Sequence, residues 1–385
     1  MIVLFIKRGN FVFKNSYTIG KIFDIPIKLH ISFLLIFPFL VWSFGNNLSA
    51  MVENNDMFDI TPVLNPYFLG LILVLALFAS VLFHELAHSL VARKQGIEIK
   101  GINLLLLGGI AEMDELNEET KDEASIALAG PAFSLALGLI LFFSSFLFGY
   151  FNLLQGWFSD LVLILYILGF MNVFLAIFNL LPAFPTDGGR ILRALLARKI
   201  PYLKATRIAV SIGKAFAIVF GFIGFVSGNF ILVFIAFYIF ISASQESHYS
   251  VIKDALSEYS VGDLMTEDVS IVEKSMSVNE LVDKMLYEKH SGFPVIDEGI
   301  LTGIVTMEDV QSISPEEYRN MTVGDIMVDE IKTVSADDDI FKAFKLLFQE
   351  NIGRLIVVED GKMSGIITRS DIMKGFRLLQ MRRKR

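Results

Sequence analysis

Two histidines and a glutamate stand close together in an otherwise apolar stretch of the chain. His84, Glu85 and His88 form the pattern His-Glu-x-x-His within a run of apolar residues from about 68 to 92. In a helix, residues four apart lie on one face, so both imidazoles can bind the same metal ion. The adjacent glutamate can serve as general base toward a water molecule at that metal. The alternative is a set of buried polar groups satisfied by the core, but an ionisable group at membrane depth costs about 2.5 kcal/mol or more, which favours the metal site.

The composition around this motif is typical of a membrane protein. Of the 385 residues, 54% are hydrophobic and 36 are Phe, which is too apolar for a soluble chain of this length. The apolar residues are concentrated before about residue 250, and the remainder has the composition of a soluble domain. The net charge of −8, with basic residues dispersed among acidic ones, gives no indication of nucleic-acid binding. The chain has no cysteine, which excludes disulfides and thiolate metal ligands.

The apolar segments predict six transmembrane helices. We expect them at about 31–44 with flanking residues, 66–96, 124–150, 161–181, 208–226 and 230–247. Gly130-Pro131 is expected to bend or break the third of these spans. The basic segment before the first span lacks a small-residue cleavage site, so we interpret it as a cytoplasmic leader into a retained helix and not as a signal peptide.

Lysine and arginine set the predicted orientation of these spans. The connections at 45–66, 149–160 and 227–229 contain neither residue, whereas the leader and the alternate connections are basic. The positive-inside rule therefore predicts that both termini lie in the cytoplasm. The second span then runs inward, and the rise of a helix places the histidine pair roughly 8–15 Å below the cytoplasmic surface.

Residues 97–113 form an apolar segment that is too short to span a membrane and is bounded by glycines. We expect a re-entrant hairpin here, with an interfacial loop as the alternative. Backbone at that depth is tolerated only against protein or a water-filled cavity. An exposed strand edge of such an element could pair with an extended peptide.

A His-Glu-x-x-His pair needs one more protein ligand. The fourth span also runs inward, and Pro182 and Pro185 end it just before Asp187. Taken alone, an Asp-Gly dipeptide indicates a turn or a helix cap, but the position of Asp187 opposite the histidine pair favours a ligand. Three other residues are weaker candidates, because they lie at the start of a span or at an interface: His30, Glu112 and His248.

Two motifs together resemble the site-2 protease family of intramembrane zinc metalloproteases, peptidase family M50, over residues 20–250. They are His84-Glu85-x-x-His88 in one membrane helix and Asn179-x-x-Pro182-x-x-x-x-Asp187-Gly188 in a later one. The resemblance implies one Zn²⁺ ion per chain, held by His84, His88 and Asp187. It also implies that Glu85 is the catalytic base, that Asn179 helps to hold the substrate or transition state, and that residues 97–113 present the substrate in extended form.

The C-terminal part contains an internal repeat with a period of 62 residues. The segment 261–265 recurs at 323–327, and 303–306 recurs at 365–368. Each copy predicts a strand, an amphipathic helix (278–288 and 340–350), two further strands and a final helix. One such copy cannot cover its own apolar face, so the two copies are expected to stack on each other.

This repeat resembles a tandem pair of cystathionine-β-synthase (CBS) modules, with boundaries at 257–316 and 319–380 after a membrane domain at 1–250. The resemblance implies an adenine nucleotide in the cleft between the copies, contacted at its phosphate and ribose. The matching residues are Thr306, Asp309, Thr368 and Asp371. The alternative is that these residues only cap the final helices, because Thr followed three residues later by an acid is a capping signature.

The sequence therefore predicts a polytopic α-helical membrane protein with six transmembrane helices and a membrane-embedded hairpin, followed by a soluble α/β tandem CBS module. The expected function is a zinc endopeptidase that cuts transmembrane segments of other membrane proteins, regulated by adenine nucleotide. The expected partners are such substrates, the lipid bilayer of the cell membrane and a second copy bound through the CBS modules. Two alternatives are a CBS-regulated transporter or channel that uses the His-Glu-His face as an ion site, and a catalytically idle membrane scaffold.

Overall fold

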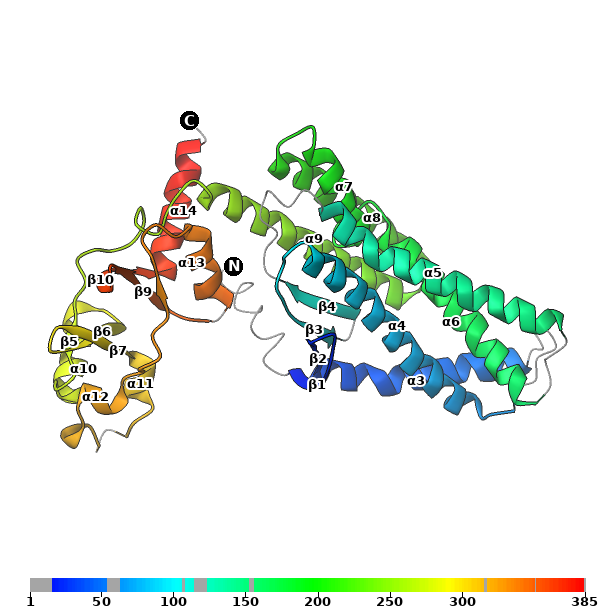
Figure 1. Cartoon of the computed structure of the whole chain (residues 1–385), viewed down its shortest axis with the longest axis horizontal. Coiled ribbons are helices and arrows are strands. Elements are labelled where there is room, and N and C mark those ends of the chain that lie inside the picture. Colours follow the sequence, from blue (N-terminus) through cyan, green and yellow to red (C-terminus); the bar gives the residue numbers. More distant parts are fainter. Residues whose placement is uncertain are drawn as a thin grey trace. The chain divides into compact units, whose positions relative to one another are not determined.

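The computed structural model describes residues 16–53, 63–105, 108–113, 123–151, 156–314, 317–349 and 351–383. Internal contacts divide the chain into two compact units, with the boundary between Ser250 and Val251. The first unit carries the apolar helices and the second unit carries the repeat. Each unit is described separately below, with the element labels of Figure 1.

Within the described residues, six helices are long and apolar enough to cross a membrane, as predicted. They are α3 (Ile31–Glu53), α4 (Pro66–Lys94), α5 (Glu123–Tyr150), α6 (Trp157–Asn179), α8 (Tyr202–Ser227) and α9 (Phe230–Leu256). The start of α4 follows from its sequence: Pro66 occupies the first helical position, and the Asn65 side chain accepts a hydrogen bond from the Tyr67 amide at 2.9 Å. The chain is a multi-pass membrane protein.

Helix α5 runs without a break through Pro131, so the expected break at Gly130-Pro131 was wrong. Proline removes one intrahelical hydrogen bond, and neighbouring helices can support a helix at such a point. Helices α5 and α6 lie side by side and approach closely at Gly138 and Gly169. A Cβ at Gly138 would lie 2.9 Å from the Gly169 carbonyl oxygen, which is the close approach that small residues permit between membrane helices.

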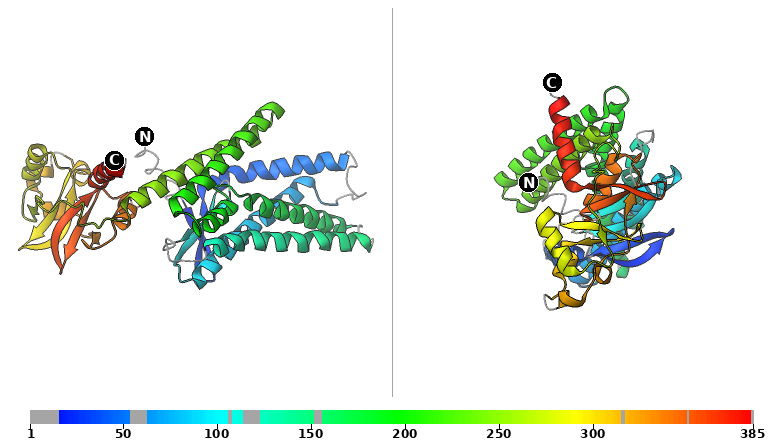
Figure 2. Two further views of the ribbon diagram at one scale, coloured as in Figure 1. Left: turned by 90° about the horizontal axis from the view of Figure 1, so that it is seen from above. Right: turned by 90° about the vertical axis from the view of Figure 1, so that its left-hand side faces the viewer.

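Four strands form a sheet at one end of these helices (Figures 1 and 2). The order is β1 (Ser16–Ile22), β2 (Ile25–His30), β3 (Ile99–Leu105) and β4 (Gly108–Met113). The predicted hairpin at 97–113 is the antiparallel pair β3–β4. Strand β2 pairs in parallel with β3 and antiparallel with β1. The sequence did not predict the β1–β2 hairpin.

Alternate residues of β2 and β3 bury one face of this sheet against α4. The apolar core at this contact contains Ile25, Ile27, Leu86, Ile102 and Leu104. In β2 this period of two is the pattern of a strand with one buried face, whereas in β3 Asn103, between Ile102 and Leu104, is buried as well. Because Leu86 lies inside the His-Glu-x-x-His motif, this packing fixes the motif relative to the sheet, whose two edge strands are β1 and β4.

A short helix that the sequence did not predict carries Asp187. Helix α7 (Asp187–Ala197) follows a proline-rich bend after α6. The Thr186 hydroxyl donates to the carbonyl oxygens of Leu181 and Ala183, at 2.6 and 2.7 Å, and so closes the bend. Phe184 is buried against Ala209, which anchors the bend on α8.

The second unit contains two three-stranded sheets, β5 (Val272–Glu273), β6 (Gly292–Asp297) and β7 (Ile300–Thr306), and β8 (Thr333–Val334), β9 (Arg354–Glu359) and β10 (Lys362–Thr368). Its helices are α10 (Val278–Glu288), α11 (Met307–Gln311), α12 (Val323–Ile326), α13 (Ile340–Gln349) and α14 (Arg369–Arg383), with a 3₁₀ turn η1 (Glu317–Asn320). The bounds of β6 and β7 coincide with those of β9 and β10 after a shift of 62 residues.

The two copies also exchange backbone contacts. Thr266 pairs with Ile366 of the second copy, and Val328 pairs with Ile304 of the first copy. A shift of 62 residues converts one pair into the other, so the copies are related by an approximate two-fold axis. The predicted mutual packing of the two copies is therefore confirmed.

Candidate metal centre

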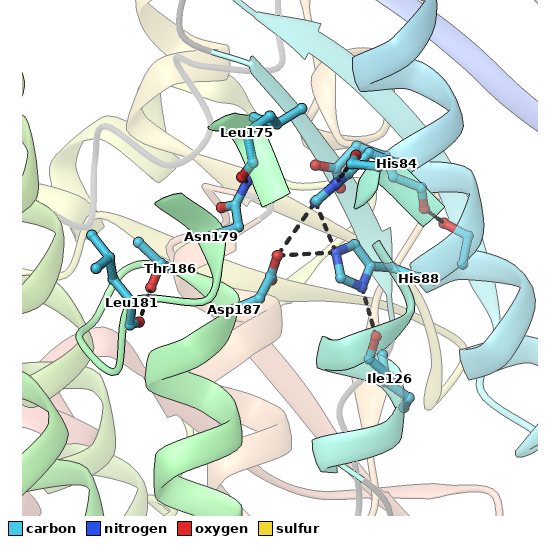
Figure 3. A network of polar contacts seen from close by, with 11 residues as sticks. His84, His88, Ile126, Leu175, Asn179, Leu181, Thr186 and Asp187 are labelled. Atoms are coloured by element: carbon cyan, nitrogen blue, oxygen red, sulfur yellow. Dashed lines mark hydrogen bonds and ion pairs between the residues drawn. The ribbon is translucent and has the colours of Figure 1, made fainter. Parts of the chain in front are cut away.

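The two histidines of α4 lie on one helix face and point toward the start of α7 (Figure 3). Their Nε2 atoms are 3.2 Å apart. Both side chains are buried, with 4% and 6% of the residue exposed for His84 and His88. The spacing of four residues therefore has the geometric effect that the sequence predicted.

The Asp187 carboxylate reaches the same point, although Asp187 lies 103 residues after His84 in the sequence. Its Oδ2 lies 3.3 Å from His84 Nε2 and 3.2 Å from His88 Nε2. The aspartate is the first residue of α7, so the bend after α6 and the start of α7 together aim it at the histidines. These three side chains form a group whose ligand atoms could hold one metal ion.

The outer ring nitrogens of both histidines have partners of their own. His88 Nδ1 lies 2.6 Å from the carbonyl oxygen of Ile126, which can only accept, so Nδ1 carries the proton and Nε2 of the neutral ring carries a lone pair. His84 Nδ1 lies 2.9 Å from the Ser134 hydroxyl. The lone pair of His88 Nε2 and the Asp187 carboxylate oxygen thus face each other beside His84 Nε2, and a cation bound between these three atoms would satisfy all of them.

The geometry fits zinc in particular. Four ligands bound about 2.0–2.1 Å from a tetrahedral zinc ion lie about 3.3–3.4 Å from each other. The three separations here are 3.2, 3.2 and 3.3 Å. Two nitrogens and one oxygen are also a donor set that zinc accepts, and three protein ligands leave one corner of the tetrahedron open.

The backbone of two glycines lies directly against this group. A Cβ added at Gly130 in α5 would lie 2.2 Å from His88 Nε2 and 2.6 Å from His84 Nε2. A Cβ added at Gly109 in β4 would lie 2.4 Å from Cγ of Glu85. The edge strand therefore passes beside the carboxylate that the sequence predicted as general base.

The other sequence candidates lie elsewhere or make different contacts. His30 Nδ1 lies 2.7 Å from the Ser32 hydroxyl, Glu112 forms an ion pair with Lys28 at 3.0 Å, and His248 is exposed on α9. Asn179 is the last residue of α6, and its amide donates to the Leu175 carbonyl of its own helix at 3.1 Å.

Three contacts to the histidines were not found from the sequence. Gly130, Ser134 and the Ile126 carbonyl all come from α5, and only their spacing along one helix face could have suggested that they act together. Without a known partner helix, that spacing is also expected of any packed membrane helix.

The residues predicted to contact nucleotide form two equivalent capping boxes. Asp309 accepts from the amide and hydroxyl of Thr306 at 2.7 and 2.6 Å. Asp371 accepts from the same two groups of Thr368 at 3.1 and 2.6 Å. The capping alternative therefore describes the contacts that these side chains make within the chain.

Comparison with known proteins agrees with the geometry of the first unit. The model of peptidase family M50 matches residues 72–162 and 152–220. A zinc metalloprotease of Methanocaldococcus jannaschii is 37% identical over 371 residues, which is 95% of this chain and 98% of the relative. The chain belongs to peptidase family M50. The solved structure titled as a site-2 protease from the same organism is 37% identical and covers 60% of this chain and 95% of its own, with a TM-score of 0.42.

The second unit of this M50 family member matches a different model. The CBS domain model matches residues 261–316 and 323–377. A solved structure of CBSX2 in complex with AMP is 31% identical and covers 32% of this chain and 98% of its own, with a TM-score of 0.29. The two family models and the metalloprotease relative thus support a membrane metalloprotease with a CBS pair.

Proposed function

We propose that this chain is an intramembrane zinc endopeptidase that hydrolyses peptide bonds within or near transmembrane segments of other membrane proteins. The observation that carries the proposal is the near-equilateral arrangement of His84 Nε2, His88 Nε2 and Asp187 Oδ2, with separations of 3.2–3.3 Å. This arrangement occurs inside a set of apolar helices long enough to span a membrane.

The roles of the side chains follow from their positions. His84, His88 and Asp187 would hold the zinc ion, which when bound supplies a Lewis acid that polarises the scissile carbonyl and acidifies water. Glu85 is adjacent to His84 and takes a proton on its carboxylate from the attacking water. The same carboxylate then delivers this proton to the nitrogen of the leaving amine. Asn179, at the end of α6, is proposed to help hold the substrate.

The substrate must reach this site in extended form, because a helical backbone hides its carbonyl groups. Strand β4 is one of the two edges of the four-stranded sheet, and its Gly109 lies against Glu85. An extended substrate segment paired with the free edge of β4 would therefore run past the base and the metal ligands. The absence of a side chain at Gly109 lets the Glu85 side chain lie directly against this strand.

The basic connections support an orientation with both termini in the cytoplasm and the metal near the cytoplasmic side of the cell membrane. For the CBS pair we propose binding of adenine nucleotide at Thr306, Asp309, Thr368 and Asp371, because these residues occupy equivalent positions in the two copies. The module would regulate cleavage and could join two chains into a homodimer.

The variant Glu85→Gln tests the proposed reaction. The purified full-length protein in lipid nanodiscs should contain about one zinc per chain and cleave a single-span test substrate. Glu85→Gln should keep the zinc and lose cleavage by roughly 10²-fold or more, because the general base is removed while the ligands remain. Cleavage by Glu85→Gln at the wild-type rate, or a wild-type protein without zinc, would contradict the proposal. A transporter would instead show ion flux without a peptide product.

A further inference from the structure

A buried arginine connects the helix that carries Asp187 with two other helices. Arg193 lies on α7, six residues after Asp187, and is only 7% exposed. Its Nε donates to both carboxylate oxygens of Glu123 at 3.1 and 3.3 Å, and its Nη2 donates to the same carboxylate. Its Nη1 donates to Glu246. One guanidinium thus joins α7 to the first residue of α5 and to α9.

The same guanidinium also holds the bend in front of Asp187. Its Cζ lies 4.7 Å from the ring centre of Phe184 and 4.9 Å from that of Tyr202. Phe184 is buried and precedes Asp187 by three residues, so Arg193 contacts the chain on both sides of this ligand. Cation–π contacts of a desolvated guanidinium are among the stronger ones of their kind.

The link to α5 reaches the histidines as well. Glu123 begins α5, and Ile126, one turn later, accepts the hydrogen bond from His88 Nδ1. Gly130, one further turn along α5, lies against both Nε2 atoms. Burial by itself would lower the pKa of the Arg193 guanidinium, but the carboxylates of Glu123 and Glu246 raise it above its ordinary value, so Arg193 is a permanent cation at this junction.

Helix α9 extends this connection toward the second unit. Glu246 lies in the part of α9 that belongs to the first unit. Ile252 and Leu256, farther along the same helix, belong to the apolar core of the second unit together with Val261 and Ile340. Glu246 and these core residues of the second unit thus belong to one continuous helix.

We propose that Arg193 is a positioning residue that fixes Asp187 and the start of α5 relative to each other, and that Glu246 makes this arrangement responsive to α9. The inference rests on the proposed function, because Asp187 matters here as a zinc ligand. Planar guanidinium geometry is essential, since a lysine offers one charged nitrogen and cannot bond Glu123 in two places while also reaching Glu246.

The test uses full-length Arg193→Lys, Glu246→Gln and the control Arg198→Gln, which removes an exposed cation at the end of α7. Zinc affinity is measured by competition with a chelator, and ligand geometry by the visible spectrum of the Co²⁺-substituted protein. Thermal melting reports folding. We expect Arg193→Lys to weaken zinc binding about 10-fold or more and to alter the Co²⁺ spectrum, as loss of supporting contacts does at other metal sites. The control should match the wild type.

Glu246→Gln should alter the Co²⁺ spectrum and weaken zinc binding less than Arg193→Lys does. In the Arg193→Lys background the same change should add little, because both variants break one contact. When Arg193→Lys and Glu246→Gln cleave the test substrate, we expect kcat to fall by a larger factor than KM rises. A folded Arg193→Lys with wild-type zinc affinity and Co²⁺ spectrum would overturn the inference, as would an equal loss in Arg198→Gln.

If Arg193→Lys does not fold, Glu246→Gln decides, since its carboxylate is partly exposed: a wild-type Co²⁺ spectrum in this variant overturns the inference. Failure of the proposed function would look different. The zinc affinities and spectra would differ between variants as expected, but the wild-type protein would cleave no test substrate.

Discussion

The backbone of Gly130 faces Nε2 of His88 so closely that a Cβ at this position would lie 2.2 Å from that nitrogen. Helix α5 thus lines the metal centre with its backbone at Gly130, where no side chain intervenes. A Gly130→Ala variant should weaken zinc binding by about 100-fold, because the new methyl group occupies the space that both imidazoles need. Chelator competition measures this change.

Gly149 supplies the matched control for that variant. It lies on the same helix, and a Cβ there would meet no atom within 4 Å. Gly149→Ala should therefore leave the zinc affinity unchanged and stabilise α5 slightly. If Gly130→Ala bound zinc as tightly as Gly149→Ala does, the placement of α5 against the histidines would be wrong.

The Ser134 hydroxyl orients His84 by its contact with Nδ1. Ser134→Ala should lower the zinc affinity about 10-fold, because the ring loses the partner that holds its rotation. The control is Ser144→Ala on the same helix, whose hydroxyl donates to the Ile140 carbonyl at 2.7 Å. Equal zinc affinities of the two variants would show that the Ser134 contact has no role in metal binding.

A substitution at Gly109 tests the role of Glu85 as general base and leaves the three metal ligands unchanged. In Gly109→Ala the methyl group would displace the Glu85 side chain, whose Cγ lies 2.4 Å from the built Cβ. We expect kcat to fall roughly 10²-fold with full zinc content, since a displacement of about 1 Å can have this effect on a catalytic group. Gly20→Ala, at an open position of β1 in the same sheet, should cleave at the wild-type rate. Loss of zinc in Gly109→Ala would instead place the strand against the ligands themselves.

The CBS pair contains its own control for nucleotide binding. Thr322 and Asp325 form a capping box like those of Thr306–Asp309 and Thr368–Asp371, with distances of 2.8 and 2.9 Å, but they are not among the predicted nucleotide contacts. Loss of any of these caps should lower stability by about 1 kcal/mol. ATP or AMP should raise the melting temperature of the wild type, and Asp309→Asn or Asp371→Asn should reduce this rise.

The Asp325→Asn control should lose stability to a similar extent and still respond to nucleotide. If Asp309→Asn and Asp371→Asn responded as fully as Asp325→Asn, the capping role alone would explain Thr306 and Thr368. A wild-type protein whose melting temperature is unaffected by either nucleotide would contradict nucleotide binding altogether.

Local patterns in the sequence carried much of the architecture. Six apolar runs indicated the six long helices because a membrane span needs about 20 apolar residues in succession. The spacing of His84 and His88 predicted one helix face, since helical periodicity is a local property. The repeat predicted two equivalent copies, and the bounds of β6 and β9 agree with it. Of the bend or break predicted at Gly130-Pro131, the break was wrong, because the effect of a proline depends on the helices that surround it.

What the sequence determined by itself is the chemistry available to this protein: a pair of imidazoles on one helix, an adjacent carboxylate and an aspartate after a later span. The tertiary structure alone decided that Gly130 and Ser134 of α5 line this centre, that β1 and β2 join the hairpin beside Glu85, and that Arg193 connects α7 with α5 and α9. These contacts join residues far apart in the chain, so each depends on how whole helices and strands pack. A short window of sequence holds only one partner of each such contact. The role of that residue becomes visible only when the folded chain has placed both partners side by side.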